Sequence, residues 1–413
     1  MIPTEARVVI VGGGIAGASI AYHLGKLGWR DIVVLEQGEL ASGTTSHAPG
    51  LVGQLRSSVS LTKLLMDSVA LYRTLRVDDE AGFFEVGSLR VASSRERLTE
   101  LQEQAEFAAR VGLEAHLLGP AEAVRLCPLM SLDGVEGALF VPSDGSATAT
   151  LLARSLTGEA RRLGVSFHTQ VRVHAIDVHN GRIRALETSQ GRIATETLVV
   201  AAGIWSPLLA RLVGISLPLT PMQHQYVVTA PLPELAGQTI ANLRDPDKLV
   251  YLRQREETLV IGGYERNPRL FSVDAIPART DPTVQTFDAR HFEPLRRAMA
   301  ERVPRLTTTE LAKGVNGIES FTPDGEFLLG PSRQVGGFWV ACGFCAHGIS
   351  GAGGVGKALA EWIVTGQPEL DLSATAIERF GPQAADAHFI GQGASRVYGT
   401  YYDLRRTEVV GEG

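Results

Sequence analysis

Three glycines near the N-terminus have the spacing that binds the pyrophosphate of a dinucleotide. Gly12, Gly14 and Gly17 form a G-x-G-x-x-G pattern after a β-branched run, and an apolar-periodic segment begins at Ile15 and Ala16. In such a strand–turn–helix the first glycine permits the tight turn. The second lets the backbone approach the phosphates, and the third lets the helix pack on the strand. The helix N-terminus adds unpaired N–H groups and a positive dipole end. The pattern predicts dinucleotide binding.

A carboxylate follows at the spacing at which dinucleotide-binding proteins hold a ribose. Glu36 ends a second β-branched run, 31–35, and lies roughly 20 residues beyond the glycines, with Gln37 next. A carboxylate there can accept hydrogen bonds from ribose hydroxyls. A glycine pattern alone also fits an ordinary strand–turn–helix. Because strand, helix, second strand and terminal acid occur in register, the sequence favours a bound dinucleotide.

The loop after the second strand carries one strongly nucleophilic side chain. It reads SGTTSHAPGL from Ser42 to Leu51, and His47 is that side chain. Small and hydroxylated residues let such a loop pass close to a bound cofactor. The residues by themselves leave two interpretations of His47 open. It is either a loop histidine hydrogen-bonded to backbone or a nucleophile directed at the cofactor.

Polar residues in the second half of the chain are candidates for chemistry on a substrate. From about residue 217 the pattern changes to alternating strands, over 222–229, 249–255 and 258–264. His224 could accept a proton near neutral pH. Tyr251 and Arg253 share a strand face because alternate residues do. A buried substrate carboxylate needs a cation or several donors, and we expect Arg253, or else Arg56, to supply it. By residue type alone, His224 is more often a hydrogen-bonded core histidine and Tyr251 a packing residue.

Two cysteines near the C-terminal end have the spacing C-x-x-C. Cys342 ends a predicted strand and Cys345 follows in a glycine-rich turn, with His347 nearby. One cysteine pair with one histidine is short of a tetrahedral zinc set. We therefore expect neither a metal site nor redox chemistry from this pair.

The elements that must position these residues form an α/β fold. The periodicity predicts helices over 15–27, 61–75, 94–111, 120–126, 147–163, 288–303 and 352–364. It predicts further strands over 7–11, 85–92, 137–141, 165–169, 171–178, 198–202 and 338–342. We expect a Rossmann-like nucleotide domain interleaved with an antiparallel-sheet substrate domain. The nucleotide domain takes 1–80, 146–215 and 326–380, the substrate domain takes 81–145 and 216–325, and 381–413 is a tail.

Composition excludes several classes of protein. A chain of 413 residues with 44% hydrophobic content can bury a large core in two domains. Its net charge of −6 includes no basic stripe, which argues against nucleic acid. No run of about 18 apolar residues predicts a membrane span. The first strand begins at Arg7, which leaves no room for a signal peptide, and three cysteines suit a reducing compartment. We expect a cytoplasmic protein.

Two motifs resemble one flavoprotein family. SGTTSHAPGLVGQLR and the segment HQYVVT at 224–229 resemble dimethylglycine dehydrogenase, dimethylglycine oxidase and sarcosine dehydrogenase. These are flavoproteins of the D-amino acid oxidase-like superfamily, and the resemblance runs from residue 1 to about 406. It implies FAD bound covalently to His47 through the 8α-methyl of the isoalloxazine. The related monomeric sarcosine oxidases use a cysteine before a T-P-D segment. Here that segment, 319–324, has no cysteine, which favours the histidine.

The resemblance also assigns roles along the chain. It implies that the backbone of Val173 contacts adenine, and that His224 and Tyr251 line the amine pocket. Trp205 stands where the family has an aromatic, although a packing residue explains it equally well. The turn entering the last helix suits the flavin pyrimidine, which becomes anionic on reduction. The predicted cofactor contacts are Gly12, Gly14, Ile15, Ala16, Gly17, Glu36, Gln37, Gly43, Thr44, Thr45, Ser46, His47, Leu51, Val173, Ala202, Gly203, Trp205, Gly343, His347, Gly348 and Ile349.

The resemblance implies oxidative N-demethylation of a small N-methylated amino acid. A hydride equivalent passes to flavin N5, and water hydrolyses the resulting iminium to formaldehyde and the demethylated amine. The acceptor that reoxidises the flavin is oxygen or an electron-transfer protein. Two alternatives remain open: a deaminating or ring-oxidising amino-acid dehydrogenase of the same superfamily, and a non-catalytic regulatory protein. The family includes a regulatory subunit of pyruvate dehydrogenase phosphatase.

The family's C-terminal folate domain has no counterpart in this sequence. In the family, an acidic residue of that domain couples to the histidine and tyrosine of the amine pocket. We therefore expect formaldehyde to be released free. The alternative is a separate folate-binding subunit that docks through an exposed tail around Tyr398–Tyr402.

Overall fold

Two β-sheets organise the molecule. The computed structural model describes residues 1–276 and 284–404. Within this part of the chain the first sheet has six strands, in the order β11-β2-β1-β15-β23-β22. They are β1 (Val8–Val11), β2 (Ile32–Leu35), β11 (Ser166–His168), β15 (Leu198–Val200), β22 (Leu328–Pro331) and β23 (Phe338–Cys342). All neighbours run parallel except β22 and β23. The carboxyl ends of the parallel strands therefore meet at one edge.

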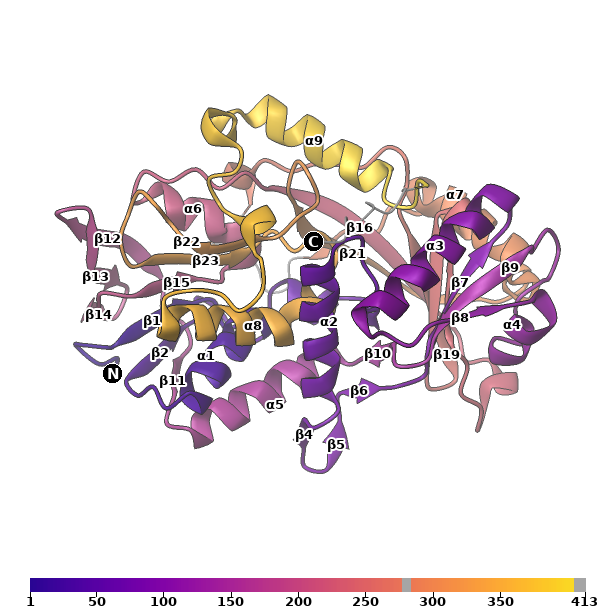
Figure 1. Cartoon of the computed structure of the whole chain (residues 1–413), viewed down its shortest axis with the longest axis horizontal. Coiled ribbons are helices and arrows are strands. Elements are labelled where there is room, and N and C mark those ends of the chain that lie inside the picture. The colour runs from indigo at the N-terminus through magenta and orange to yellow at the C-terminus, as the bar shows by residue number, and fades with distance from the viewer. Residues whose placement is uncertain (277–283, 405–413) are drawn as a thin grey trace.

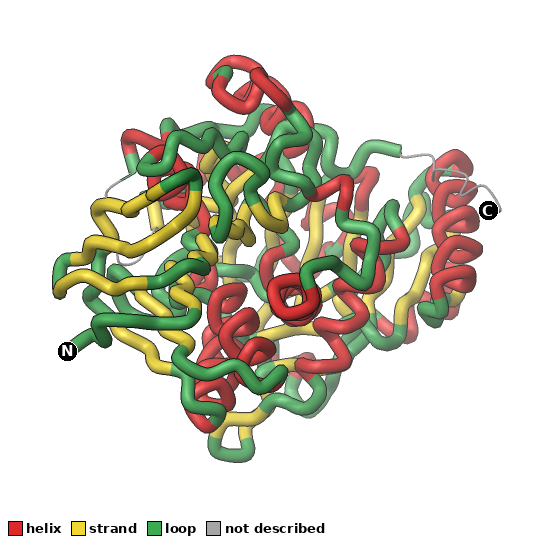
Figure 2. The backbone as a smooth tube through the Cα atoms, turned by 60° about the vertical axis from the view of Figure 1, so that its left-hand side comes forward, coloured by secondary structure: helices red, strands yellow, loops and turns green. Residues whose placement is uncertain are grey.

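Both faces of the first sheet are covered. Its helices are α1 (Ile15–Lys26), α5 (Ala149–Arg162) and α8 (Gly348–Thr365), and a small sheet consists of β12 (Val173–His179), β13 (Arg182–Thr188) and β14 (Gly191–Ala194). Val8 and Ile10 of β1 pack in the cluster with α1 and α8, whereas Val9 and Val11 pack with β12–β14. A strand that is buried on both faces is apolar at every position, as β1 is. Figure 2 shows strands, in yellow, beside the N-terminus, where Glu5 bridges to Ala194 of β14.

The second sheet is largely antiparallel. Among the described residues it has nine strands, in the order β20-β21-β16-β19-β18-β17-β7-β9-β8. They are β7 (Ser88–Ala92), β8 (His116–Leu118), β9 (Gly137–Val141), β16 (Thr220–Thr229), β17 (Asn242–Asp245), β18 (Val250–Arg255), β19 (Thr258–Gly263), β20 (Val284–Gln285) and β21 (Leu311–Phe321). Strands from two distant parts of the chain thus share one sheet, joined by the parallel pair β7–β17. In Figure 1 the first sheet lies to the left and this one to the right.

One face of the second sheet forms a core, and the other carries polar side chains. Leu252 and Ile261 pack with Phe292 and Leu295 of α7 (Ala289–Arg302). The opposite face of the sheet carries polar side chains such as His224. The remaining elements are α2 (Val59–Tyr72), α3 (Arg95–Val111), α4 (Pro120–Leu126), α6 (Ser206–Arg211), α9 (Ala387–Gly399), β3 (Leu51–Val52), β4 (Arg76–Val77), β5 (Glu80–Ala81), β6 (Phe83–Phe84) and β10 (Gly145–Ala147). None of the helices in the described ranges is long and apolar enough to cross a membrane.

Helix α8 begins earlier than the predicted start at 352. Its first residue is Gly348, so part of the glycine-rich run is helical rather than a turn. These glycines let α8 lie directly against its neighbours. A Cβ at Gly354 would lie 1.9 Å from the Leu64 carbonyl oxygen of α2, and one at Gly356 would lie 2.1 Å from Ser19 Oγ of α1. Close helix packing, rather than turn formation, explains their glycine content.

The last helix contradicts the prediction of an exposed tail. Tyr398 of α9 is fully buried and Tyr402 is 7% exposed. Both pack in one cluster with Tyr251 and Tyr264 of the second sheet. Figure 1 shows α9 in yellow, lying across the top of the molecule. Tyr398 and Tyr402 are therefore not available as an exposed surface on which a folate-binding subunit could dock.

Candidate active site

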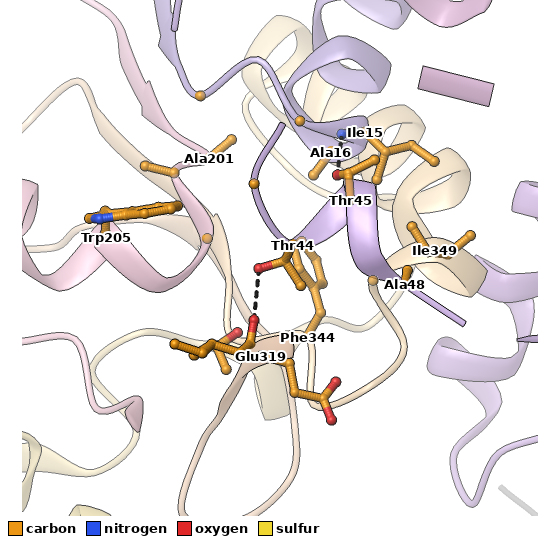
Figure 3. Close-up of a pocket in the computed structure, with 18 of the residues that line it drawn as sticks. Ile15, Ala16, Thr44, Thr45, Ala48, Ala201, Trp205, Glu319, Phe344 and Ile349 are labelled. Carbon is orange, nitrogen blue, oxygen red and sulfur yellow. Dashed lines mark hydrogen bonds between the residues drawn. The ribbon is translucent and has the colours of Figure 1, made fainter. Parts of the chain in front are cut away.

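A cavity of about 460 Å³ connects the glycine turn after β1 to the polar face of the second sheet. This volume lies within the range of ordinary ligand pockets. Figure 3 shows Trp205 and Ala201 on one side, Ile15 and Ile349 on the other, and Glu319 between them. Most predicted cofactor contacts line it: Gly12, Gly14, Ile15, Ala16, Glu36, Gln37, Gly43, Thr44, Thr45, His47, Leu51, Val173, Ala202, Gly203, Trp205, His347, Gly348 and Ile349.

Three of the predicted cofactor contacts lie outside this lining. Gly17 packs α1 on β1, since a Cβ there would lie 2.0 Å from the Gly12 carbonyl oxygen. Ser46 is exposed and donates to the carbonyls of Ser42 and Gly43. Gly343 also lies outside the lining, and a Cβ at this glycine would lie 2.8 Å from the Thr322 side chain. Both contacts stay predictions.

The nucleotide end of the cavity has the shape that a dinucleotide needs. Gly12 has φ +119°, and a Cβ there would lie 2.3 Å from the Ala201 carbonyl oxygen. Glu36 accepts hydrogen bonds from the N–H groups of Gly13 and Gly38, both at 2.8 Å. Burial raises the pKa of Glu36. A glycine cradle with a half-buried carboxylate beside it fits a pyrophosphate next to a ribose.

His47 lies in the middle of the cavity wall, in the short turn Thr44–His47. Its Nε2 lies 3.2 Å from the carbonyl oxygen of Ile318. Gly317 faces the imidazole, and a Cβ at this glycine would lie 2.3 Å from His47 Cδ2. Burial lowers the pKa of His47 to about 4, so the imidazole is neutral near pH 7. A neutral imidazole is the nucleophilic form.

At the end of the cavity formed by the second sheet, His224 is held between two tyrosines. Its Nε2 lies 2.7 Å from Tyr251 Oη, and its Nδ1 lies 3.0 Å from Tyr398 Oη. Burial, and then the charge of His47, lowers the pKa of His224 to about 3. The structure thus brings the predicted pair together. Tyr398 was not predicted, because it comes from a helix far along the chain.

Aromatic rings and one acid complete this end. Tyr264 and Tyr401 stack with ring centroids 3.8 Å apart, and Tyr401 Oη lies 2.8 Å from Nε2 of His347. Aromatic faces attract an ammonium group. Glu319 also lines the cavity, with Oε1 3.6 Å from His224 Nδ1. Burial, and then the charge of Glu265, raises the pKa of Glu319 to about 8. Glu319 was not predicted, because its neighbours Ile318 and Ser320 give no local pattern that marks a site.

The arginine preferred from the sequence lies outside the cavity. Arg253 donates from Nε to the Pro49 carbonyl and from Nη1 to the Gln254 carbonyl at 3.3 Å, so it supports the His47 loop. Arg56 lines the cavity, as does Arg244, which pairs with Tyr251 across strands β17 and β18. Burial lowers the pKa of Arg56 to about 10, and repulsion from Arg244 contributes. Arg56 and Arg244 are therefore the better candidates for a carboxylate site.

The C-x-x-C cysteines are buried and free. Cys345 Sγ lies 3.3 Å from both N and Oγ1 of Thr322. Burial raises the pKa of Cys342 and of Cys345 to about 12, which keeps both as thiols. Cys342 packs in the core of the first sheet, and Cys345 lies in the turn before α8, where it lines the cavity.

Comparison with known proteins agrees with this geometry. Residues 7–362 match the family described as FAD dependent oxidoreductase. The mitochondrial pyruvate dehydrogenase phosphatase regulatory subunit of Mus musculus is 33% identical, over 98% of this chain and 46% of that protein. Mitochondrial sarcosine dehydrogenase of Homo sapiens is 36% identical, over 93% of this chain and 42% of that protein. The chain thus spans about half the length of these relatives.

A solved structure shares the fold. L-proline dehydrogenase from P. horikoshii superimposes with a TM-score of 0.82 at 23% identity, covering 92% of this chain and 98% of that one. The predicted α/β fold of the D-amino acid oxidase-like type is confirmed by these matches. The chain belongs to the family of FAD dependent oxidoreductases.

Proposed function

We propose that this chain oxidises a small N-methylated amino acid and releases formaldehyde. The observation that carries the proposal is the amine end of the cavity, where His224 and Tyr251 form a neutral hydrogen-bonded pair among aromatic rings. The glycine turn, Glu36 and the turn before α8 would hold FAD, with His47 as its covalent attachment point. When bound, FAD supplies the oxidant that accepts a hydride equivalent at N5.

The chain's own residues bind the substrate and remove its proton. Arg56 and Arg244 carry guanidinium groups that can pair with the substrate carboxylate. Tyr264 and Tyr401 offer ring faces to the methylated ammonium. The ammonium proton leaves through Tyr251 and His224, which pass it on rather than hold it, because the pKa of His224 is lowered to about 3. Only an amine with a free lone pair can become an iminium. Water then adds to the iminium carbon, and the adduct collapses to formaldehyde and the demethylated amine.

An anaerobic screen for bleaching of the flavin tests this function and distinguishes it from the alternative functions. Sarcosine, dimethylglycine, N-methylproline or 4-methylaminobutanoate should bleach the flavin and yield one formaldehyde per flavin reduced. Betaine is the control, because its quaternary nitrogen has no lone pair to form an iminium. Bleaching by glycine or proline, without formaldehyde, would instead indicate a deaminating or ring-oxidising dehydrogenase. Bleaching by none of these amines would indicate a regulatory protein, which is the role named for the mouse relative. Reoxidation in air would identify oxygen as the acceptor.

Replacing Arg244 should weaken the binding of carboxylate substrates. A buried charged hydrogen-bonding partner contributes about 1.5–3 kcal/mol, so Arg244→Leu should raise KM for sarcosine by about 10- to 100-fold. Steady-state kinetics with N-methylpropylamine, which has no carboxylate, should show little change. Arg255→Leu is the control, since Arg255 is exposed at the end of the neighbouring strand β18. Equal changes in KM for both amines would remove Arg244 from the carboxylate site.

A further inference from the structure

A row of hydrogen-bonded side chains continues from His224 away from the cavity. Tyr398 Oη lies 3.0 Å from His224 Nδ1 and donates to Oε2 of Glu265 at 2.9 Å. The other oxygen of Glu265, Oε1, lies 2.8 Å from Nε2 of His291. His224 and Tyr251 line the cavity, whereas the other three residues do not. The row therefore leaves the substrate site rather than forming part of its wall.

Exposure rises along the outer three residues of the row, Tyr398, Glu265 and His291. Tyr398 is fully buried, and Glu265 is 8% exposed. The side chain of His291, in the first turn of α7, is 15% exposed. Three separate elements meet here: the end of α9, the residues after β19, and the start of α7. The row thus begins in the interior and ends at the surface.

The hydrogen bonds can all point in one direction. If Tyr251 donates to Nε2 of His224, the imidazole proton is on Nδ1 and is donated to Tyr398 Oη. The hydroxyl of Tyr398 in turn donates to Glu265. Each donor then points toward the carboxylate of Glu265, which is an acceptor when ionised. A proton that enters at Tyr251 can move outward by one short shift at each bond.

We propose that Tyr398 and Glu265 conduct the proton released by the substrate ammonium from His224 to His291 at the surface. This rests on the proposed amine oxidation. The ammonium N–H bond breaks, its electron pair stays on nitrogen, and its proton goes to Tyr251. Tyr251 passes its own proton to His224, which passes one through Tyr398 to Glu265. Oε2 of Glu265 takes up this proton, and rotation of the carboxyl group then brings the O–H to the position of Oε1, beside Nε2 of His291. His291 accepts the proton and exchanges it with water. Tyr398 and Glu265 are positioning residues, because they act through His224.

Other titratable groups near the row do not provide an equivalent route for a proton to the surface. The titratable groups that face His224 are His47, Tyr251, Tyr264, Glu319 and Tyr398, and those that face Glu265 are Tyr398, His291 and Glu319. Glu319 is the nearest competitor. Its Oε1 is buried without a hydrogen-bond partner among the described residues, so no hydrogen bond leads onward from this oxygen.

The test compares the wild-type holoenzyme with variants in which one side chain of the row can no longer pass on a proton. Reduction of the flavin by sarcosine is followed anaerobically by stopped flow from pH 6 to pH 10. Tyr398→Phe and Glu265→Gln should each slow reduction by about 100-fold at pH 7. At about pH 10, where an alkylammonium loses its proton to water unaided, both should return to within about 2-fold of wild type. Tyr226→Phe is the matched control, because Tyr226 is a buried tyrosine on β16 outside the cavity lining.

The pH dependence separates a relay from a packing role. The double variant should be no slower than either single variant, because both act on one path. A loss of equal size at every pH would overturn the relay, as would unchanged rates in both variants. Covalent flavin content equal to wild type shows that each variant is folded. If no N-methyl amine bleaches the wild-type flavin, the proposed function fails and the relay fails with it. If the wild type is bleached but the variants have wild-type profiles, the relay alone fails.

Discussion

Acid-precipitated wild-type protein should keep its yellow colour, whereas His47→Ala protein should release its flavin into the supernatant. The expected difference is nearly all or none, because a covalent bond survives unfolding and non-covalent contacts do not. His47 suits the bond since burial keeps its imidazole neutral and it lies on the cavity wall next to Gly317. The measurement is flavin absorbance in pellet and supernatant. Wild-type protein that releases its flavin would contradict the attachment.

Gly317→Ala gives a second test that keeps the histidine. The added Cβ would lie 2.3 Å from His47 Cδ2, so the imidazole must move. We expect the covalent fraction to fall although His47 is present. Gly158→Ala is the control, because no atom lies within 4 Å of a Cβ there. A normal covalent fraction in Gly317→Ala would show that the position of the ring is not critical.

His224→Gln should slow flavin reduction by sarcosine by about 100- to 1,000-fold at pH 7. Glutamine fills similar space and forms hydrogen bonds, but it cannot take up one proton and pass on another. The amine must then lose its proton to water, so the pH profile should shift to alkaline values. Because the pKa of His224 is lowered to about 3, its own protonation should not limit the wild-type rate between pH 5 and 9.

The control for this variant is His179→Gln, since His179 is exposed at the end of β12. Stopped-flow reduction across the pH range is the measurement for both proteins. If His224→Gln keeps both the rate and the profile of the wild type, His224 is a core residue without a role in amine activation.

The nucleotide half of the site could be read from the sequence because its signals are local. The turn at Gly12, the packing glycine Gly17 and the acid Glu36 are fixed by strand, turn and helix geometry within a short stretch. The sequence also predicted helix starts that have a capping residue. An example is Ser94 before α3, whose side chain accepts a hydrogen bond from the N–H of Arg97. Periodicity likewise placed β18 and β19 around a hairpin at Glu256, which has a positive φ.

The substrate half depended on tertiary structure. Arg244 reaches the cavity because β17 pairs with β18 in the register that sets it opposite Tyr251, and no local pattern fixes such pairing. Arg253 is on the predicted face, but its guanidinium turns to Pro49, a choice of rotamer that the sequence does not show. Tyr398 and Glu265 join His224 only because α9 folds back over the second sheet. The sequence determined the family, the nucleotide cradle and the histidine–tyrosine pair. Only the folded chain decided which arginines and acids surround that pair, because contacts between distant segments follow from strand order and helix packing.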